Sequence, residues 1–396
     1  MNSNSPNPIT ELVLRGENYQ GDAVLFDISG ERITIGAGDP KAELSMSADS
    51  LQRMIAKEVA SSELFMAGEL TIEGDFNAAI AVGAVLEADE SGGNPLESAG
   101  TENNNIAYLD NVGLLVGDLH ATRDRFEQLG FNLAERGTHY YENPPGTFTT
   151  WGTANHCVNF RDGGLLEFIA HYYPEHPAGL YGQQLEASGN HWGKITLHCQ
   201  SADGEVARLK RQGRPTADAS TLYRYIDGEQ FSPDPKHSKK TLLFSYPTSF
   251  QDGFMMVGAE HTLGEFPISD AHYSHPNGAE RMPFALIAAA DLEGTVERYE
   301  QAVSIKSEHY NGEYRIALGR DTHLRFTASD ALPPSIASLV ADRPVACVGA
   351  GFEVRDLGLC KALLDERGLT TEESRWGLMV GEPIKGSGTV FFGKAR

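Results

Sequence analysis

The sequence predicts an α+β protein in which a small sheet-and-helix domain is followed by four consecutive βαβββ units. One observation is the composition of residues 89–105, which are rich in Gly, Ser, Asn and acidic side chains, contain a single Leu, and therefore predict an acidic, flexible linker. The other is that one pattern of strand, helix and short strands recurs four times after this linker. We therefore expect one domain over residues 1–88 and two further domains, of two units each, over residues 106–274 and 275–396.

Residues 1–88 contain the elements of a small domain. The runs AVLFDI and ERITI alternate in polarity on either side of Ser29-Gly30, which predicts a two-residue hairpin turn. The runs AELSMS and ELTIEGD predict two further strands. Ser47 can cap a helix that we expect to continue through Ala60, and residues 76–88 predict a second, strongly apolar helix.

The four units after the linker can be aligned by the starts of their helices. A residue able to cap a helix follows each first strand: Asp118, Ser201, Asp291 and Asp356. Eight residues further along each helix lies an apolar side chain that we expect to face the sheet: Phe126, Leu209, Tyr299 and Leu364. Short strands with apolar ends complete each unit: GGLLEFIA, DGFMMVGA, THLRFTA and GTVFFG.

The charge of the chain limits the classes of partner. Its 396 residues include 55 acidic and 32 basic side chains, which gives a formal charge of −23. Such a surface repels phosphate backbones and anionic lipids, so we expect no nucleic acid partner and no membrane insertion. The polar N-terminus, the lack of a long apolar run and four widely spaced cysteines predict a cytoplasmic protein.

The N-terminal domain resembles a lipid-binding family. The run GELTIEGD at Gly68 to Asp75, with the apolar helix after it, is similar to the sterol-carrier-protein type 2 fold over about residues 20–88. The resemblance implies a curved sheet and an apolar helix that line a tunnel for hydrophobic molecules, whereas plain core packing is the alternative for these side chains. Too few residues precede Val24 for the long first helix that members of this family usually have.

The four units resemble the vicinal oxygen chelate superfamily, which includes glyoxalases and extradiol dioxygenases. The sequences LDNVGLLVGDL, GTAN, LLEFIA, HTLGEF and HPNGA carry this resemblance, which covers about residues 106–396. It implies that the units pair into two tandem barrels, each around a cup, in which the first and last strands of paired units would hold a divalent metal. The superfamily contains isomerases, lyases, dioxygenases and metal-free binding proteins, so the fold alone does not determine the reaction.

The alignment of the units shows which residues occupy the metal positions that the resemblance implies. The first strands place there Asn111, Lys194, Phe284 and Gly349, and the last strands place there Glu167, Met256, Arg325 and Phe391. Only Glu167 is a good ligand, so we expect no divalent metal and no other cofactor. If the alignment is shifted, Glu167 could bind a metal together with His198, which shares a strand face with Trp192, Lys194 and Thr196, or with His191 through a bulge.

Without a metal, the first cup predicts acid–base chemistry. Glu167 is the expected general base or proton shuttle, and Lys194 is expected to stabilise an oxyanion. A buried structural ion pair between these two residues is the alternative. We expect His139 and His261 to orient the substrate from the rim. Further substrate contacts are expected from Asn111, Asn155, His198, Met256 and Glu265.

These residues predict an enzyme that acts on a hydrophobic, carbonyl-bearing small molecule by proton transfer, as an isomerase or a lyase. Two alternatives stay open: a metal-free protein that sequesters a hydrophobic metabolite, and a metal-dependent dioxygenase. Ionisable side chains inside the cup favour catalysis, because their desolvation is costly and a pure carrier of hydrophobic molecules has no need of them. A homodimer is compatible with the sequence, which does not indicate the oligomeric state.

Overall fold

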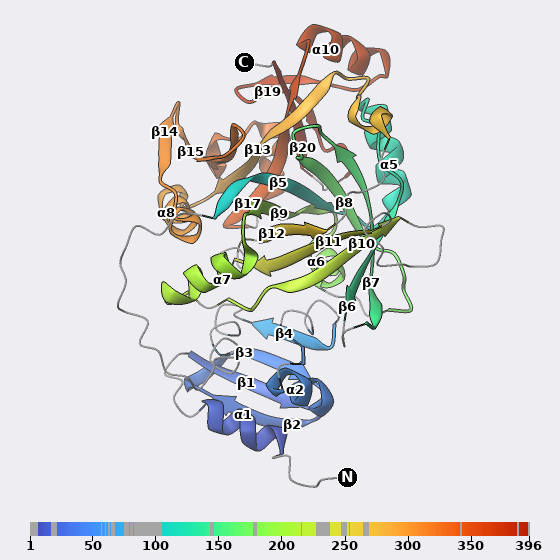
Figure 1. Ribbon diagram of the computed structural model, residues 1–396. Coiled ribbons are helices and arrows are strands. Elements are labelled where there is room, and N and C mark those ends of the chain that lie inside the picture. The colour runs from blue at the N-terminus through green and yellow to red at the C-terminus, as the bar shows by residue number, and fades with distance from the viewer. Residues whose placement is uncertain are drawn as a thin grey trace.

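The computed structural model contains three sheets (Figure 1). A small four-stranded sheet near the N-terminus, drawn in blue, lies below a larger body built from two eight-stranded sheets. Within the residues that the structure describes, no helix has the length and hydrophobicity to cross a lipid bilayer. The structure describes residues 7–16, 22–56, 58–59, 61, 64, 68–74, 79, 82, 105–142, 146–176, 180–214, 216–226, 238–246, 252, 254–263, 269–340, 343–385 and 388–394.

The N-terminal sheet has the strand order β2-β1-β3-β4, and among the described residues the helices α1 and α2 accompany it. Its elements are α1 (Pro8–Gly16), β1 (Asp22–Ile28), β2 (Glu31–Ile35), β3 (Ala37–Met46), α2 (Ala48–Ile55) and β4 (Leu70–Gly74). The predicted hairpin is confirmed, since Ser29 and Gly30 have φ angles of 53° and 93° between β1 and β2.

The helices of this domain differ in part from the prediction. Ser47 caps α2 by accepting a hydrogen bond from the Ser50 N–H, but the helix ends at Ile55, because the Glu58 N–H turns back to the Arg53 carbonyl. The chain before Val24 forms only the short helix α1. The linker and most of the apolar helix predicted over residues 76–88 lie outside the described residues.

All four predicted βαβββ units are present. Unit 1 consists of β5 (Ile106–Leu115), α5 (Leu119–Gln128), β6 (Gly137–Glu142), β7 (Phe148–Asn159) and β8 (Leu165–His171), and α6 (Leu180–Ser188) follows it. Unit 2 consists of β9 (His191–Cys199), α7 (Ala202–Arg211), β10 (Ser220–Ile226), β11 (Ser238–Ser245) and β12 (Met255–Leu263), and the 3-10 turn η2 (Asp270–Tyr273) follows it.

The last two units repeat this order of elements. Unit 3 consists of β13 (Ala279–Ala289), α8 (Leu292–Val303), β14 (Ser307–Tyr310), β15 (Glu313–Leu318) and β16 (Thr322–Ala328), and is followed by η3 (Ser329–Ala331), α9 (Pro334–Ala337) and η4 (Ser338–Val340). Unit 4 consists of β17 (Val345–Val354), α10 (Leu357–Glu366), β18 (Glu372–Ser374), β19 (Gly377–Gly381) and β20 (Thr389–Lys394).

The alignment of the four helices is confirmed. Each predicted cap accepts a hydrogen bond from the backbone N–H three residues further on, which satisfies one of the amides that a helix start leaves unpaired: Asp118, Ser201, Asp291 and Asp356. The side chain eight positions further is fully buried in every unit: Phe126, Leu209, Tyr299 and Leu364.

The units pair in order along the chain, but the two pairs close differently. Units 1 and 2 form a closed barrel with the strand order β10-β11-β12-β9-β5-β8-β7-β6, in which β10 also pairs with β6. Units 3 and 4 form an open sheet with the order β14-β15-β16-β13-β17-β20-β19-β18, so β14 and β18 are its edges. We refer to these as the first barrel and the open sheet.

One apolar core joins the first barrel to the open sheet. Phe131 of unit 1 lies 5.0 Å from the ring of Phe352 and 5.9 Å from that of Phe392 in unit 4. The HPNGA segment also connects the two parts, since the His275 ring accepts from the Asn132 N–H through Nδ1 and its Nε2 lies 3.1 Å from the Asn159 carbonyl. The segment is therefore a structural connection, as its turn-like sequence indicates.

The N-terminal domain packs against the first barrel. A single apolar cluster contains Val24, Phe26 and Leu51 of the small sheet and helix together with Trp151 and Met255 of the barrel. The small domain and the barrel thus share buried apolar surface, which stabilises their association.

Candidate active site in the first barrel

The first barrel encloses a small polar cavity. Its volume is about 50 Å³, which is room for a few water molecules. Ten of its lining side chains are polar or charged: Asp110, Asn111, His139, Glu167, Lys194, Thr196, Arg224, Lys239, Thr241 and His261. This lining suits a small polar molecule better than the hydrophobic substrate expected from the sequence.

Glu167 on β8 and Lys194 on β9 meet at one side of this cavity. The Lys194 Nζ lies 2.8 Å from Glu167 Oε2, and both side chains are only 6% exposed. The Asn155 side-chain amide donates to the other carboxylate oxygen, and Asn155 Oδ1 in turn accepts from Arg224 Nε at 2.8 Å. His139 Nε2 lies 3.5 Å from Glu167 Oε1. The structure therefore brings together four residues that the sequence analysis named for the first cup, Glu167, Lys194, Asn155 and His139, but His139 is buried beside Glu167 rather than at the rim.

The protonation of this group follows from its contacts. Burial alone would raise the pKa of Glu167, but the Lys194 ammonium and the bond with His139 lower it well below the usual value. The same ion pair raises the pKa of Lys194 despite its burial. Burial lowers the pKa of His139, so its imidazole is neutral near pH 7. Glu167 is consequently an anion whose partners hold it charged, and this makes it a weak base.

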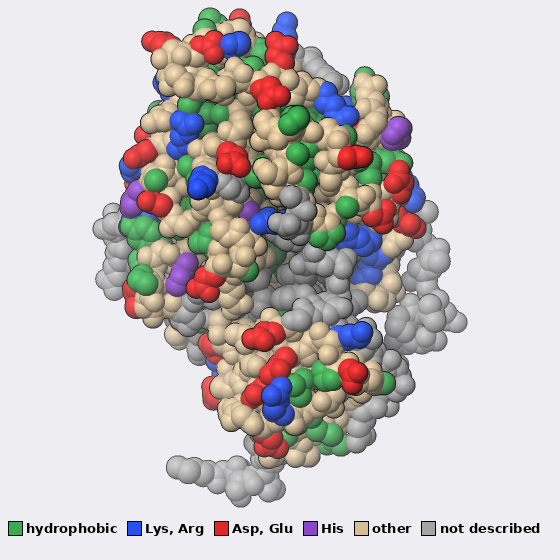
Figure 2. All heavy atoms as spheres, turned by 180° about the vertical axis from the view of Figure 1, so that it is seen from behind, with side chains coloured by type: hydrophobic (Ala, Val, Ile, Leu, Met, Phe, Trp, Pro, Cys, Tyr) green, Lys and Arg blue, Asp and Glu red, His purple; other side chains and the backbone are tan. Residues whose placement is uncertain are grey.

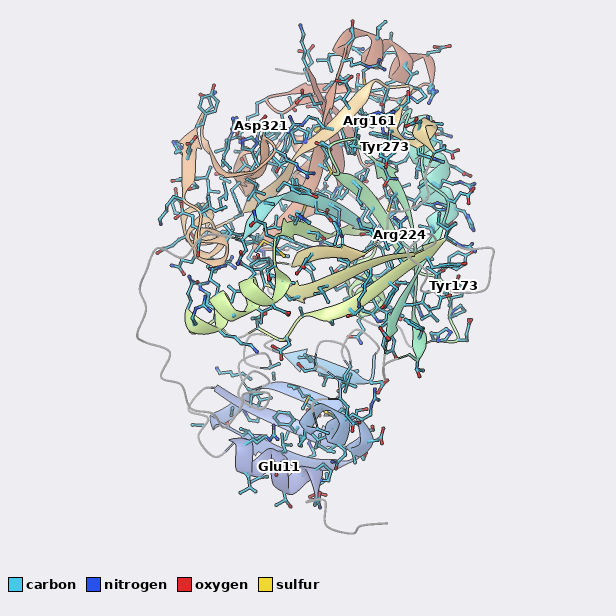
Figure 3. The ribbon with its side chains drawn as sticks, in the orientation of Figure 1. Glu11, Arg161, Tyr173, Arg224, Tyr273 and Asp321 are labelled. Carbon is cyan, nitrogen blue, oxygen red and sulfur yellow. The ribbon has the colours of Figure 1, made fainter. Side chains whose placement is uncertain are left out.

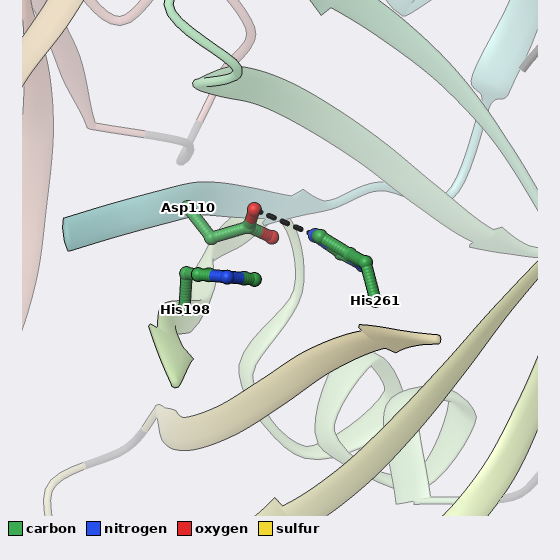
Figure 4. Close-up of side chains that lie close together, drawn as sticks. All are labelled: Asp110, His198 and His261. Carbon is green, nitrogen blue, oxygen red and sulfur yellow. Dashed lines mark hydrogen bonds and ion pairs between the residues drawn. The ribbon is translucent and has the colours of Figure 1, made fainter. Parts of the chain in front are cut away.

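A second polar group lines the same cavity, and Figure 4 shows Asp110 and His261 of this group beside His198. Asp110 Oδ1 lies 2.8 Å from Nε2 of His261, and Nδ1 of His261 lies 3.1 Å from the Thr241 hydroxyl. Lys239 Nζ lies 3.3 Å from the same Nε2. Asp110, His261 and Thr241 thus form a line of carboxylate, imidazole and hydroxyl, and we call these three residues the Asp–His–Thr line.

A register shift places Asp110 inside the barrel. The pairing of β5 with β9 shifts between Leu109 and Asn111, which marks a bulge at the residue between them. The carboxyl of Asp110 is buried, with 1% exposure, and also accepts a hydrogen bond from the Asn111 amide at 3.0 Å. Burial would raise the pKa of Asp110, but the contact with His261 and the Lys239 ammonium lower it below the usual range, so Asp110 is ionised.

The residues at the metal position implied by the fold family do not fit a divalent cation. Asn111 and Glu167 are there, but the Lys194 ammonium is bonded directly to the carboxylate. An ammonium in that place repels a cation and occupies the carboxylate lone pairs that would bind it.

A different set of side chains offers metal-binding atoms. Asp110, His198 and His261 have ligand atoms within 4.8 Å of one another. Two observations count against a metal there. The rings of His198 and His261 stack at 5.2 Å, so their nitrogens point side by side rather than at one ion, and the Lys239 ammonium lies at the His261 nitrogen.

Two of the predicted site residues lie elsewhere, and a third is outside the described residues. The repeat alignment placed Met256 in the cup, but its side chain belongs to the apolar core shared with Leu209 of α7, because β12 points Val257, Ala259 and His261 inward. His191 lies outside the cavity lining, with Nδ1 2.7 Å from the Gly189 carbonyl, so the expected metal set with Glu167 is not assembled. Glu265 lies outside the described residues.

The inward face of β9 also differs from strict alternation. Gly113 pairs with Lys194 but Leu114 pairs with Trp192, so a register shift separates these two residues of β9. Trp192 packs in the apolar core that joins the first barrel to the open sheet, rather than in the cup beside Lys194. His198 remains near the cavity residues, stacked between Tyr108 and His261.

Sequence reasoning missed Asp110, Lys239 and Thr241. Asp110 precedes the metal-position residue Asn111, and only a bulge turns it inward, which no local pattern in LDNVGL announces. Lys239 lies near the end of the polar run of residues 214–240, whose low apolar content is typical of a surface loop, whereas the structure places Lys239 and Thr241 on the barrel strand β11.

Comparison with known families agrees with both resemblances. Residues 109–303 match the glyoxalase-like domain family, and residues 9–87 match the SCP-2 sterol transfer family. The first match runs from β5 through α8 and therefore includes the whole closed barrel. The predicted combination of an N-terminal sterol-carrier-like domain with glyoxalase-like units is thereby confirmed.

Several solved structures have a related arrangement. A triple mutant of 4-hydroxymandelate synthase from Streptomyces coelicolor is 13% identical, covers 73% of this chain and 92% of its own, and gives a TM-score of 0.47. A hypothetical protein from Staphylococcus aureus is 10% identical over 72% and 99% of the two chains, with a TM-score of 0.45. The Mn(II)-bound glyoxalase from Novosphingobium aromaticivorans is 10% identical over 74% and 83%, with a TM-score of 0.44. No curated protein matches the sequence.

Proposed function

We propose that the first barrel is an enzyme site that transfers a proton within a small polar molecule carrying a carbonyl group, as an isomerase or a lyase does. The observation that supports this best is the Asp–His–Thr line, because a carboxylate that holds an imidazole beside a polar cavity is the arrangement of a general base. The glyoxalase-like fold around the cavity is compatible with this chemistry.

His261 has the geometry of the base. Ionised Asp110 can only accept a hydrogen bond, so neutral His261 carries its proton on Nε2 and its Nδ1 has the basic lone pair. This Nδ1 faces the Thr241 hydroxyl at 3.1 Å, on the cavity lining. A substrate proton passes to Nδ1 directly or through that hydroxyl, while Asp110 stabilises the imidazolium that forms.

Lys239 has the position of the group that stabilises the developing oxyanion. When the proton leaves the carbon next to the carbonyl, the electron pair of the carbon–hydrogen bond moves onto the carbonyl oxygen. Lys239 lines the cavity beside His261, so its ammonium can face that oxygen. An isomerase then returns the proton to a different carbon, and a lyase expels a leaving group from the adjacent one.

Glu167 and Lys194 have a positioning role in this proposal rather than the catalytic role expected from the sequence. Each side chain neutralises the charge of the other, and the pKa of the Glu167 carboxyl is lowered, which weakens it as a base. Through Asn155 the pair also holds Arg224, whose guanidinium lines the cavity and is labelled in Figure 3.

The test is exchange of carbon-bound protons with heavy water. The protein is incubated in D₂O with a panel of short aldehydes, ketones and 2-oxo acids, and loss of the proton signal next to the carbonyl is followed by NMR. His261→Gln should lower the exchange rate by about 10²- to 10⁴-fold, because it removes the base. The matched control is His120→Gln, since His120 is an exposed histidine outside the cavity lining.

Two results would contradict the proposal. One is exchange no faster than in buffer for every compound, even where binding is detected, which would favour a protein that sequesters its ligand. The other is a His261→Gln variant that retains the wild-type rate within a few-fold while staying folded.

A metal-dependent reaction is the second candidate, and the set Asp110, His198 and His261 is the observation that favours it. The variant that separates the two candidates is His198→Gln. A metal site should lose calorimetric binding of Zn²⁺ or Mn²⁺ and activity together in this variant, whereas proton transfer by His261 should continue within a few-fold of the wild-type rate.

A further inference from the structure

We propose that the open sheet of units 3 and 4 has its own ligand site, which binds a small organic anion with a carboxylate or phosphate group attached to a flat ring. The site is the cavity in the cup of this sheet, of about 590 Å³, compared with about 50 Å³ in the first barrel. A volume of several hundred Å³ is typical of small-molecule sites. This inference is independent of the reaction proposed for the first barrel, because the two cavities share no lining residue.

The lining of this cavity is positively charged in a strongly acidic protein. Five basic side chains, namely Arg281, Arg315, Arg325, Arg375 and Lys394, line it together with three acidic ones, Glu313, Asp321 and Glu353. The whole chain has a charge of −23, and on the face shown in Figure 2 acidic and basic side chains are interspersed. Gathering of cations in a concave site focuses the field there and attracts an anion.

One buried carboxylate fixes two of the arginines. Glu313 is 2% exposed and accepts from Arg315 Nε at 2.6 Å, from Arg325 Nε at 3.0 Å and from Trp376 Nε1 at 2.9 Å. Burial would raise the pKa of Glu313, but Arg325 lowers it below the usual value, so the carboxylate is ionised. Glu313 thus fixes the positions of two guanidinium groups in the lining of the cup, where five basic side chains stand against three acidic ones.

The same arginines lie over aromatic rings at the cavity wall. The guanidinium of Arg315 lies 4.5 Å from the ring centre of Tyr310, and that of Arg325 lies at the same distance from Phe284. Arg375 stacks over Trp376, also at 4.5 Å, and donates to Thr327. Alternating rings and planar cations form a surface on which a flat ring can stack while its anionic group meets a guanidinium.

The position of Arg325 favours an anion over a metal ion. The repeat alignment gives Arg325 the place in unit 3 that Glu167 has in unit 1, so a guanidinium stands where the fold family would hold a cation ligand. Phe284 occupies the corresponding first-strand position. Arg325 and Phe284 therefore offer no ligand to a divalent cation, and the positive charge of Arg325 that repels such a cation attracts an anion.

The test uses calorimetry at low ionic strength on the full chain with five probes: benzoate, phenyl phosphate, inorganic phosphate, acetate and the uncharged benzamide. We expect one equivalent of benzoate or phenyl phosphate to bind per chain, at least about ten-fold more tightly than acetate, inorganic phosphate or benzamide, and to weaken as salt is added. The preference between benzoate and phenyl phosphate identifies the anionic group.

Single variants test whether the arginines are the binding groups. Arg315→Met and Arg375→Met should each weaken binding by about ten-fold or more, because each removes a charge-assisted contact. Lys361→Met is the matched control, since Lys361 lies on α10 in an exposed pair with Asp365, and it should leave binding unchanged. Quenching of Trp376 fluorescence, absent in Trp376→Phe, locates the ligand in this cup even where an arginine variant is less stable.

Three outcomes would overturn the proposal. The first is no binding of any anion at millimolar concentration. The second is benzamide binding as tightly as benzoate, which would show that the cations are not used. The third is binding that both arginine variants leave unchanged.

Discussion

The first barrel and the open sheet are built from the same pair of βαβββ units, yet their cups differ in size and in charge. In the first barrel, β6 pairs with β10 and closes the ring of strands, while in the open sheet β14 and β18 have only 4 and 3 residues and remain edges. The closed cup encloses only about 50 Å³ beside a buried ion pair, and the open cup holds a cavity of about 590 Å³. Closure of the sheet therefore determines which cup can hold a large ligand.

Charge follows the same division. The first barrel puts a carboxylate, Glu167, at the last-strand position and neutralises it with the buried Lys194 ammonium. The open sheet puts Arg325 at that position and shares Glu313 with Arg315, at a cup that opens to water. Equivalent positions of the repeated unit therefore carry side chains of opposite charge in the two cups.

The largest expected difference between the two cups concerns their ion pairs. Lys194→Met leaves Glu167 charged, buried and without its cation, so it should lower the free energy of unfolding by about 3 to 5 kcal/mol. Adding Glu167→Gln should restore most of this loss, because no charge then remains to be compensated. Urea unfolding followed by circular dichroism measures both. A loss below about 1 kcal/mol for Lys194→Met would mean that the pair is not desolvated.

Acid should affect the first barrel through its buried histidines. Burial lowers the pKa of His191 to about 4, whereas in the unfolded chain it is near 6.5, so the unfolded state binds the proton first as the pH falls. Stability should therefore fall between about pH 6.5 and pH 4, and His191 alone should account for about 2 kcal/mol of the loss at pH 5.

The measurement is urea unfolding at pH 7 and pH 5 for the wild type and for His191→Gln. The variant keeps a donor for the Gly189 carbonyl but has no titrating group, so the pH-dependent loss should be smaller by that amount. The control is the corresponding change in the open sheet, His309→Gln, at an exposed histidine on β14. It should not change the pH dependence of the free energy of unfolding. The prediction would be contradicted if the free energy of unfolding fell by the same amount between pH 7 and pH 5 in His191→Gln and in His309→Gln.

The smallest expected effect belongs to the ion pair of the open sheet. Arg325→Met should cost only about 1 kcal/mol, because the buried Glu313 carboxylate keeps its bonds with Arg315 and Trp376 and is not left without a cation. Urea unfolding of this variant beside Lys194→Met tests the contrast. If Arg325→Met lowered the free energy of unfolding as much as Lys194→Met, Arg325 would be required for the stability of the open sheet, as Lys194 is for that of the first barrel.

The candidate site could be predicted from the sequence only in part. The alignment correctly brought Glu167 and Lys194 together, because two strand-centred positions of paired units meet inside a barrel. It did not find Asp110, and it put Met256 in the cup. Both errors are shifts of one residue, and on a strand a shift of one residue moves a side chain to the opposite face.

The sequence by itself determined the order of the elements, the four helix starts at Asp118, Ser201, Asp291 and Asp356, and the absence of a good ligand set at the family's metal position. These features depend on local patterns, since a cap or an apolar stripe acts within one helix or strand. Only the tertiary structure decided the bulge at Asp110, the closure of one cup and not the other, and the gathering of four arginines in the lining of the open cup. Each of these arises from pairing between strands that are distant in the chain, where the register is set by the packing of the whole sheet.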